Sequence, residues 1–386
     1  MIYYGRQDIN EADIQAVEAV LRSDFLTQGP AIERFERRVA DYCGAKYAVA
    51  VCNATAALHI ACLAAGLGKG DVLWTSPITF VASANCALYC GGDVDFVDID
   101  AKTYNMSADL LEEKLRMAKT EGKLPKMVIP VHLAGQSCDM RRIRALADEY
   151  GFAVTEDASH AVGAEYLDTK VGSCAFSDMT VFSFHPVKIV TTGEGGMVLT
   201  NDAALYEKLR LYRSHGITRD PRYMTHESDG PWYYQQIALG FNYRMTDMQA
   251  ALGCSQMDRL DEFVARRRAL AARYGTLLQG LPVVTPYVMT EAHPSWHIYI
   301  IRINHEQIGK TKQQVFEAMK KRGIALNLHY IPVHRQPYYE KLGFYRGDFI
   351  QSEKYYEEAF TLPLFYELTD EQQNYIVESL RNVLQQ

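Results

Sequence analysis

Short runs of apolar residues recur along the first 200 positions and alternate with segments of helical periodicity. Several runs are continuously apolar, as from Met127 to Val131, instead of alternating apolar with polar residues. Such runs are typical of strands that crossover helices cover on both faces. The pattern therefore predicts a largely parallel α/β sheet. Its strands are expected at Tyr47–Cys52, Asp71–Thr75, Val94–Val97, Lys126–His132, Phe152–Glu156, Met179–Phe184 and Gly196–Thr200.

Segments with helical periodicity separate these strands. An amphipathic helix is expected before the first strand, from Glu11 to Arg22. The next helix follows Asn53, a favourable N-cap, and is closed by Gly66. The helices expected between strands include Ala54–Ala65, Ala108–Met117 and Met140–Tyr150. The alternation ends near residue 215, so the polar stretch Thr218–Gln236, which contains Pro and Gly, is expected to form a long, weakly ordered loop.

A different pattern follows residue 245. Long helical patterns fill Thr246–Gln279, and shorter elements of both kinds come after them. These are expected to be a strand near Trp296–Ile303, a helix at Thr311–Arg322, a strand near Ile324–Tyr330 and a final helix at Asp370–Leu384. The chain is therefore predicted to have a large α/β domain with an N-terminal arm at residues 1–245. Linking helices and a small α+β domain are predicted at residues 246–386.

The composition argues against several classes of function. The 386 residues carry a formal net charge of −7 without a dense stripe of Lys and Arg, so nucleic acid is not an expected partner. The eight cysteines form no CxxC pair and no zinc-type spacing with histidine, which predicts reduced core residues and no metal site. The chain shows neither a signal-peptide layout nor the roughly 18 apolar residues of a membrane span. We therefore expect a cytoplasmic protein with no membrane partner.

One lysine lies where a parallel sheet places its ligands. Lys188 follows the buried strand Met179–Phe184 and precedes the Gly-rich turn Gly193–Gly196. Taken alone, a lysine in a loop is usually a solvated surface charge. Asp157, however, ends another strand of the same sheet, and ligands of open α/β sheets bind at the carboxyl ends of strands. Asp157 is either the N-cap of a helix or the partner of a protonated pyridine nitrogen, which a carboxylate stabilises.

A phosphate and an aromatic ring have candidate partners nearby. The turn Cys52–Ala57 leaves a strand and opens a helix, so its backbone N–H groups and dipole favour an anion, although Asn53 can equally be a simple cap. Ser183 supplies a further hydroxyl donor. Phe80 follows another strand end and is either a core aromatic or a platform for a flat heteroaromatic ring. No Walker-type or GxGxxG fingerprint is present, which disfavours nucleotide hydrolysis and a Rossmann dinucleotide site.

Six motifs together are typical of one known family. They are Leu26–Pro30, Asn53–Leu58, Glu156–Ala161, Ser183–Gly196, Gly240–Met245 and His329–Pro332. Through them the chain resembles, over nearly its whole length, the DegT/DnrJ/EryC1/StrS family of sugar aminotransferases. The resemblance implies the fold-type I, aspartate-aminotransferase-like fold of pyridoxal-phosphate enzymes. That fold is α/β, with a mostly parallel central sheet, helices on both of its faces and a small C-terminal α+β domain.

The resemblance also implies roles for individual residues around pyridoxal 5′-phosphate. Lys188 is implied to be the catalytic Schiff-base lysine, Asp157 to pair with the pyridinium and His160 to lie near the phenolic oxygen. Phe80 is implied to stack on the ring. The implied phosphate contacts are Ala54, Thr55 and Ser183, together with Asn242 reaching across from the neighbouring subunit. An active site shared within a homodimer follows from these roles.

The residues implied to contact substrate come from several segments. They are Tyr4, Asp24, Phe25, Leu26, Thr27, Ala54, Ser183, Asn242, His329, Tyr330, Ile331 and Pro332. The alternative for Tyr4 and Tyr330 is ordinary surface packing, and the segment from Asp24 to Thr27 can equally be the loop that leaves a helix. These alternatives stay open at the level of sequence.

The family implies ping-pong transfer of an amino group from L-glutamate to a nucleotide-linked keto sugar. Within the family, the chain is similar to the branch that aminates C4 of UDP-2-acetamido-2,6-dideoxy-β-L-arabino-hex-4-ulose in pseudaminic acid biosynthesis. The similar segments are Thr75–Asn85, Glu156–Gly163, Lys170–Gly172 and Arg213–Gly216. Alternatives are amination of a dTDP- or GDP-linked 3- or 4-keto sugar, a pyridoxal-phosphate sugar dehydratase and a non-catalytic sensor. The retained Lys188 favours amine transfer, because dehydratase relatives carry histidine in its place.

Overall fold

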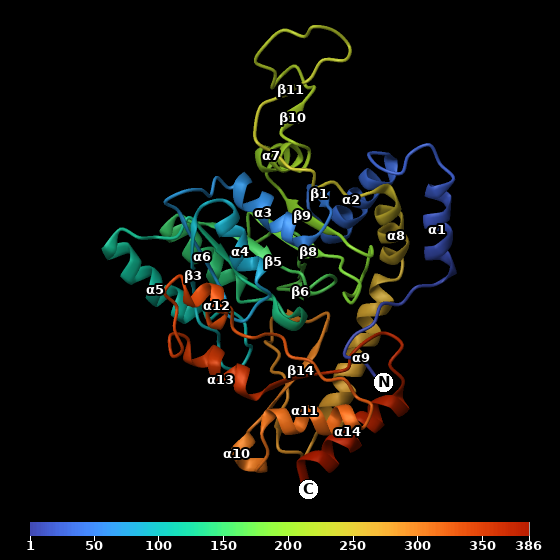
Figure 1. The fold of residues 1–386 in the computed structure, drawn as a ribbon, viewed down its shortest axis with the longest axis vertical. Helices are drawn as coiled ribbons and strands as arrows, with labels where there is room; N and C mark the ends of the chain where they lie inside the picture. The colour runs from blue at the N-terminus through green and yellow to red at the C-terminus, as the bar shows by residue number, and fades with distance from the viewer. Residues whose placement is uncertain (386) are drawn as a thin grey trace.

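The computed structural model describes residues 1–385, and a seven-stranded sheet forms its centre (Figure 1). The strands β8, β5, β4, β2 and β3 are parallel to one another, while β9 runs antiparallel to both of its neighbours. In spatial order they are β1 (Tyr47–Val51), β9 (Gly196–Thr200), β8 (Met179–Ser183), β5 (Ala153–Asp157), β4 (Met127–Ile129), β2 (Val72–Thr75) and β3 (Asp93–Phe96). The mostly parallel α/β sheet and its seven expected strands are confirmed.

Apolar side chains cover both faces of this sheet, as the continuous apolar runs predict. Val181 and its neighbour Phe182 point to opposite faces, because successive side chains of a strand alternate. Val181 packs with helices α3 (Ala54–Ala64) and α4 (Ala82–Tyr89). Phe182 packs with α2 (Pro30–Cys43) and α8 (Asp247–Met257). Burial on both faces fixes the register of each strand, since a slip by one residue would exchange the two apolar sets.

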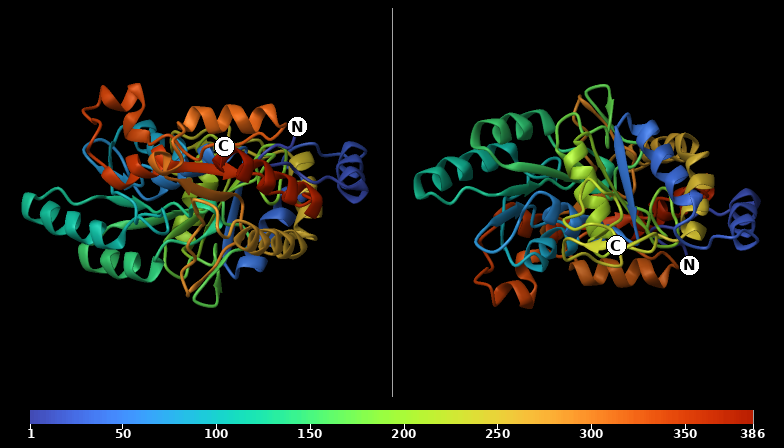
Figure 2. Two further views of the ribbon diagram at one scale, coloured as in Figure 1. Left: turned by 90° about the horizontal axis from the view of Figure 1, so that it is seen from below. Right: turned by 90° about the horizontal axis from the view of Figure 1, so that it is seen from above.

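The outer helices extend the molecule on either side of the sheet. Helices α5 (Ala108–Glu121) and α6 (Met140–Tyr150) pack on β2, β4 and β5 through a cluster that includes Trp74. At the other end lies α1 (Glu11–Leu21), whose N-cap Asn10 forms a capping box with Asp13. Figure 2 shows α1 and the α5–α6 pair at opposite ends of the molecule.

A smaller antiparallel sheet lies near the C-terminus, at the bottom of Figure 1. Its strands are β12 (Val283–Val284), β14 (Tyr299–Ile303) and β15 (Ala359–Leu362). Helices α9 (Leu260–Leu277), α11 (Lys312–Lys321) and α14 (Asp370–Gln385) enclose an apolar cluster with this sheet. An α+β unit is therefore present, while the domain boundary at residue 245 remains a prediction, because α8 packs on α1 and α2.

The prediction of a strand near Ile324–Tyr330 is wrong. This segment forms only isolated bridges, from Ile324 to Ile2 and from Asn327 to Thr361. The side chain of Asn327 accepts a hydrogen bond from the N–H of Leu328 at 2.8 Å, which competes with a regular ladder. The place beside β14 is taken instead by β15.

The stretch expected to be a long loop is a projecting hairpin, seen at the top of Figure 1. Helix α7 (Ala203–Arg213) leads into it, and β10 (Ile217–Thr218) pairs with β11 (Gln235–Gln236) at its base.

The remaining short elements are β6 (Glu165–Tyr166), β7 (Thr169–Lys170), β13 (Ala292–His293), η1 (Leu133–Gly135), η2 (Val333–Arg335), α10 (His305–Ile308), α12 (Pro337–Glu340) and α13 (Ile350–Glu358). None of the helices described is both long and apolar enough for a membrane crossing. All eight cysteines are free, as expected.

Candidate active site

A cavity of about 580 Å³ lies beyond the carboxyl ends of β5 and β8. Segments far apart in the sequence form its wall, including the start of α3, the loop after β8 and residues 327–330. The predicted site residues that line it are Tyr4, Ala54, Thr55, Phe80, Asp157, His160, Ser183, Lys188, His329 and Tyr330. The fold therefore brings most of the predicted cofactor residues to one space.

Asp157 is buried and held in one orientation. Its side chain is 4% exposed and accepts hydrogen bonds from Ser83 Oγ at 2.6 Å and from the N–H of Ser159 at 3.1 Å. Thr79 Oγ1 lies 2.7 Å from Ser83 Oγ and extends this chain of hydroxyl groups. No helix begins after Asp157, so its alternative role as an N-cap is wrong. An oriented carboxylate at this point can pair with a cationic ring nitrogen.

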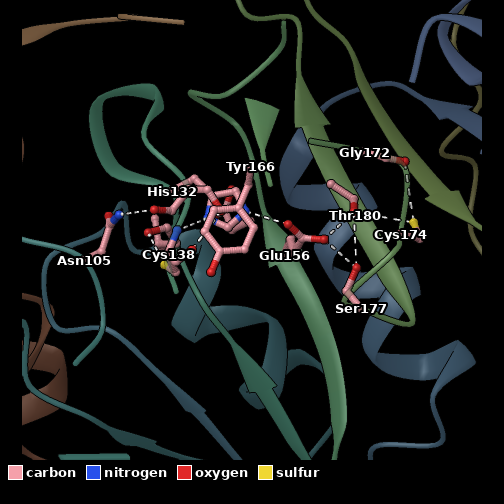
Figure 3. A network of polar contacts seen from close by, with 12 residues as sticks. Asn105, His132, Cys138, Glu156, Tyr166, Gly172, Cys174, Ser177 and Thr180 are labelled. Carbon is pink, nitrogen blue, oxygen red and sulfur yellow. Dashed lines mark hydrogen bonds and ion pairs between the residues drawn. The ribbon is translucent and has the colours of Figure 1, made fainter. Parts of the chain in front are cut away.

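A second polar network anchors β5 from the opposite face of the sheet (Figure 3). Glu156 accepts hydrogen bonds from His132 Nε2 at 2.6 Å, Ser177 Oγ at 2.5 Å and Thr180 Oγ1 at 3.0 Å. These bonds outweigh burial and hold the pKa of Glu156 below its usual value. The backbone N–H of His132 also donates to the carbonyl of Asp157 at 3.0 Å. The strand that carries Asp157 is thus fixed on both faces.

Lys188 lies in the cavity and is partly buried, so it is not a solvated surface charge. Burial lowers the pKa of its amine to about 8, and the nearby carboxylate of Asp157 opposes this shift. A lysine with a pKa near neutrality is a competent nucleophile and proton carrier, because a usable fraction is unprotonated. The geometry therefore suits covalent chemistry at Lys188.

The rate at which the protein combines with pyridoxal phosphate, the cofactor that the sequence motifs imply, should rise with pH. Only the unprotonated amine of Lys188 attacks an aldehyde, and its pKa lies at about 8. The second-order rate constant should therefore increase by about tenfold from about pH 7 to about pH 9 and then level off. Stopped-flow absorbance after mixing apoprotein with the cofactor measures this profile. A rate that keeps rising up to about pH 10.5 would contradict the lowered pKa.

The start of α3 forms the side of the cavity suited to an anion. Asn53 caps the helix by accepting from the N–H of Ala56 at 2.8 Å, and Ala54 and Thr55 line the cavity beside it. A helix N-terminus with free N–H groups favours a phosphate. Gly196 lets this turn lie against β9, since a Cβ there would come within 2.5 Å of the Asn53 carbonyl group.

Gly196→Ala should weaken both the fold and the anion site. The added methyl group would push the start of α3 away from β9, and overpacking of this kind costs about 1–3 kcal/mol. Chemical denaturation and equilibrium titration with pyridoxal phosphate measure the two effects. Gly275→Ala is the matched control, because a Cβ at that helical position meets nothing within 4 Å. Equal stability of the two variants would argue against the close approach.

Three histidines and a tyrosine surround Lys188. His160 Nε2 lies 3.0 Å from Tyr330 Oη, and His160 Nδ1 accepts from the N–H of Ala134 at 3.3 Å. Burial and the positive charge of Lys188 lower the pKa of His329 to about 3 and hold the pKa values of His160 and His297 well below the usual range. Burial raises the pKa of Tyr330. These groups are therefore neutral near pH 7.

Several cavity residues were not identified from the sequence as contacts. They are Thr79, Ser83, Ser159, His185, Val187, Glu194, His297, Asn327 and Leu328. Ser83 follows the predicted Phe80 by three residues, and its N–H donates to the Phe80 carbonyl at 3.2 Å, so nearness to Phe80 in the sequence could have identified it. His297 belongs to no motif, and only the tertiary fold brings it here.

Other predicted contacts lie outside this cavity. Phe25 and Leu26 are 54% and 47% exposed, and Asp24, Thr27 and Asn242 are exposed as well. Ile331 is 46% exposed, while Pro332 is buried. Their roles toward cofactor and substrate stay predictions.

Known proteins resemble this chain over almost its full length. Residues 7–381 match the model of the DegT/DnrJ/EryC1/StrS aminotransferase family. The spore coat polysaccharide biosynthesis protein SpsC of Bacillus subtilis (strain 168) is 39% identical over 384 residues, which are 99% of this chain and 96% of the relative.

Solved structures share the fold as well. Helicobacter pylori PseC, described as an aminotransferase involved in the biosynthesis of pseudoaminic acid, matches with a TM-score of 0.90 and 30% identity over 99% of both chains. Spr1654 from Streptococcus pneumoniae has structures in a PLP form and a PMP form. Its PMP form matches with a TM-score of 0.88 and 30% identity over 98% of both chains.

Proposed function

The chain belongs to the DegT/DnrJ/EryC1/StrS aminotransferase family, and we propose that it transfers an amino group from L-glutamate to C4 of a UDP-linked 4-keto-6-deoxy-N-acetyl-hexose. The coarser function follows from the family: the protein is a pyridoxal-phosphate-dependent sugar aminotransferase with a fold-type I, aspartate-aminotransferase-like architecture. The observation that carries the function at the level of residues is the shared cavity of Lys188 and Asp157.

Pyridoxal phosphate suits the groups that line this cavity. The oriented carboxylate of Asp157 would pair with the pyridine nitrogen, the amine of Lys188 would hold the aldehyde carbon, and the start of α3 with Ser183 would receive the phosphate. Phe80 is 58% exposed and lines the cavity, so its ring face is free to stack. Once bound, the cofactor supplies an electron sink for negative charge at the reacting carbon.

The chain's own contribution to the reaction is binding and proton transfer. The amine of Lys188, once free, would carry a proton between the reacting carbon of the substrate and the aldehyde carbon of the cofactor, a task for which a pKa of about 8 is well placed. The neutral state of His160 and His329 leaves Lys188 as the main titrating cation near pH 7. Tyr330 and Tyr4 line the same space and would exclude water from it.

The proposed sugar, UDP-2-acetamido-2,6-dideoxy-β-L-arabino-hex-4-ulose, rests on likeness to PseC and on the motifs shared with the pseudaminic acid branch. Tyr4, His329 and Tyr330 would contact the sugar within the cavity. The nucleotide would extend toward the exposed segment from Asp24 to Thr27 and toward Ile331. The eight free cysteines support a reducing, cytoplasmic location.

A homodimer would complete the site. Asn242 and the segment from Asp24 to Thr27 are exposed in the single chain and lie outside its cavity. Leu239, close to Asn242 in sequence, is 79% exposed, and Trp232 on the hairpin is 71% exposed. Large exposed apolar side chains of this kind mark an interaction surface, and a second copy of the chain is the partner we propose.

Single-turnover amination by the pyridoxamine form tests the substrate. The protein, first converted with L-glutamate, is mixed with a panel of UDP-, dTDP- and GDP-linked 4-keto sugars, and the returning visible band of the lysine-bound cofactor is followed. The proposal expects fastest amination of the UDP-linked N-acetyl sugar. No loss of the band with glutamate, and no release of oxoglutarate, would count against an aminotransferase and favour the dehydratase alternative.

A second candidate is amination of another nucleotide-linked keto sugar used for a surface polysaccharide. The 39% identity to SpsC, a spore coat polysaccharide biosynthesis protein, favours it. In the same panel, this candidate predicts that a dTDP- or GDP-linked sugar is aminated faster than the UDP-linked one.

A further inference from the structure

A buried arginine holds one wall of the cavity. Arg267, on α9, is 2% exposed, and its Nη1 donates to the carbonyl oxygens of Trp296, His297 and Leu364 at 3.2, 3.1 and 3.0 Å. Burial lowers the pKa of this guanidinium to about 10, and no neighbouring carboxylate opposes the shift. A charge buried at such a cost ties three carbonyl groups from two separate segments together.

The backbone next to His297 is held in a strained conformation. Trp296 and Ala134 have φ values of 54° and 60°, in the left-handed region that side chains rarely adopt. The N–H of His297 donates to the carbonyl of Ala134 at 3.0 Å and so joins the two strained residues. Strain of this kind persists only where the surroundings impose it, and it occurs often at functional sites.

The imidazole of His297 lacks a partner on one side. The residue is 2% exposed and lines the cavity, and its ring centroid lies 4.5 Å from that of His160. Among residues 1–385, Nδ1 of His297 has no hydrogen-bond partner. A buried donor without a partner is rarer than a buried acceptor without one, so the proton belongs on Nε2. Since Nδ1 is buried in the wall, Nε2 is the nitrogen that can donate a hydrogen bond to a ligand in the cavity.

His160 cannot supply this free donor. Its Nδ1 accepts from the N–H of Ala134, so its proton lies on Nε2, which is within 3.0 Å of Tyr330 Oη. Both nitrogens of His160 are therefore engaged by the protein. His297 is the neighbouring imidazole whose N–H remains available.

We propose that His297 donates a hydrogen bond from Nε2 to an anionic oxygen of a ligand bound in this cavity, and that Arg267 positions it through the backbone. The inference rests on the proposed function and deepens it. Two ligands supply such an oxygen, namely the ring oxygen of the cofactor and the carboxylate of the amino donor. Burial, together with positive charge from Lys188 and Arg267, lowers the pKa of His297, so the imidazole donates in its neutral form.

The test compares His297→Phe with His297→Gln in the holoenzyme. Phenylalanine fills the space without a donor, whereas the amide nitrogen of glutamine reaches the position of Nε2. The matched control is His293→Phe, an exposed position in the same segment. One arm titrates the visible band of the lysine-bound cofactor against pH, and the other measures the L-glutamate concentration that gives half-maximal loss of that band.

His297→Phe is expected to change one of the two arms. A donor to the cofactor oxygen predicts that the band titration moves up by about one pH unit, because the anionic form loses its hydrogen bond. A donor to the carboxylate predicts that the glutamate concentration rises about tenfold. In either case His297→Gln and His293→Phe should leave the band titration unmoved. Their half-maximal glutamate concentrations should stay within about threefold of that of the unmodified protein.

If His297→Phe changes neither the pH of the band titration nor the half-maximal glutamate concentration, the inference is overturned. If the phenylalanine variant melts far below the unmodified protein, His297→Gln is compared with His297→Asn, whose amide reaches the position of Nδ1. Equal behaviour of that pair also overturns it. If the unmodified protein does not react with glutamate at all, the proposed function fails, and the pH titration alone decides on His297.

Discussion

Replacing Lys188 with alanine is expected to lower turnover by about 10⁴-fold or more, since the variant loses both a nucleophile and a proton carrier. The fold should remain intact, because Lys188 lies in a cavity and outside the apolar clusters that hold the sheet. Oxoglutarate released from L-glutamate in a single turnover measures the activity, and thermal unfolding measures the fold.

Lys312→Ala is the matched control for this experiment. Burial lowers the pKa of Lys312 to about 8 as well, but the residue lies on α11 and outside the cavity. Its replacement should leave turnover within about twofold, since it removes an amine of similar pKa far from the reacting atoms. If Lys188→Ala kept a rate near that of Lys312→Ala, the chemistry assigned to Lys188 would be wrong.

The central sheet could be predicted because several of its strands are continuously apolar. The run at Met127–Ile129 is apolar and buried at every position, so burial on both faces can be read from composition alone. The segment Ile324–Tyr330 begins with an apolar run but is not a strand, because Asn327 interrupts the run and bonds to the backbone of Leu328. β14 pairs with β12 on one side and on the other with β15, a four-residue run directly after α13 that no turn residue separates from the helix.

The candidate site was predictable where a residue ends a strand. Lys188 follows β8, and Asp157 ends β5. The carboxyl ends of parallel strands meet at one edge of the sheet, so the two residues come together there. His297 comes from the distant C-terminal part of the chain, and its position depends on Arg267 and Ala134. The local pattern of apolar and polar residues around His297 does not indicate such contacts. Asn242 lies outside the cavity of the single chain, so its contact with the cofactor stays a prediction that rests on the proposed homodimer.

Asp157→Asn should lower turnover by about 10²- to 10⁴-fold, because removing one partner of a buried ion pair costs about 3–5 kcal/mol. Asparagine has nearly the same shape: its Oδ1 can still accept from the N–H of Ser159, and its Nδ2 can donate to Ser83 Oγ, so the substitution removes charge and keeps the geometry. Without the carboxylate, the ring nitrogen of the cofactor is less readily protonated and withdraws electrons less well. The single-turnover rate with L-glutamate measures the loss.

Asp168→Asn controls for the change of an acid to an amide, because Asp168 is exposed and lies outside the cavity. Its rate should match that of the unmodified protein. A cofactor analogue with a methyl group on the ring nitrogen carries the positive charge permanently, so it no longer needs a carboxylate to keep a proton. With this analogue, Asp157→Asn should regain part of the lost rate. If the variant were slow with both cofactors, or as fast as Asp168→Asn with the natural one, Asp157 would not act through charge on the ring.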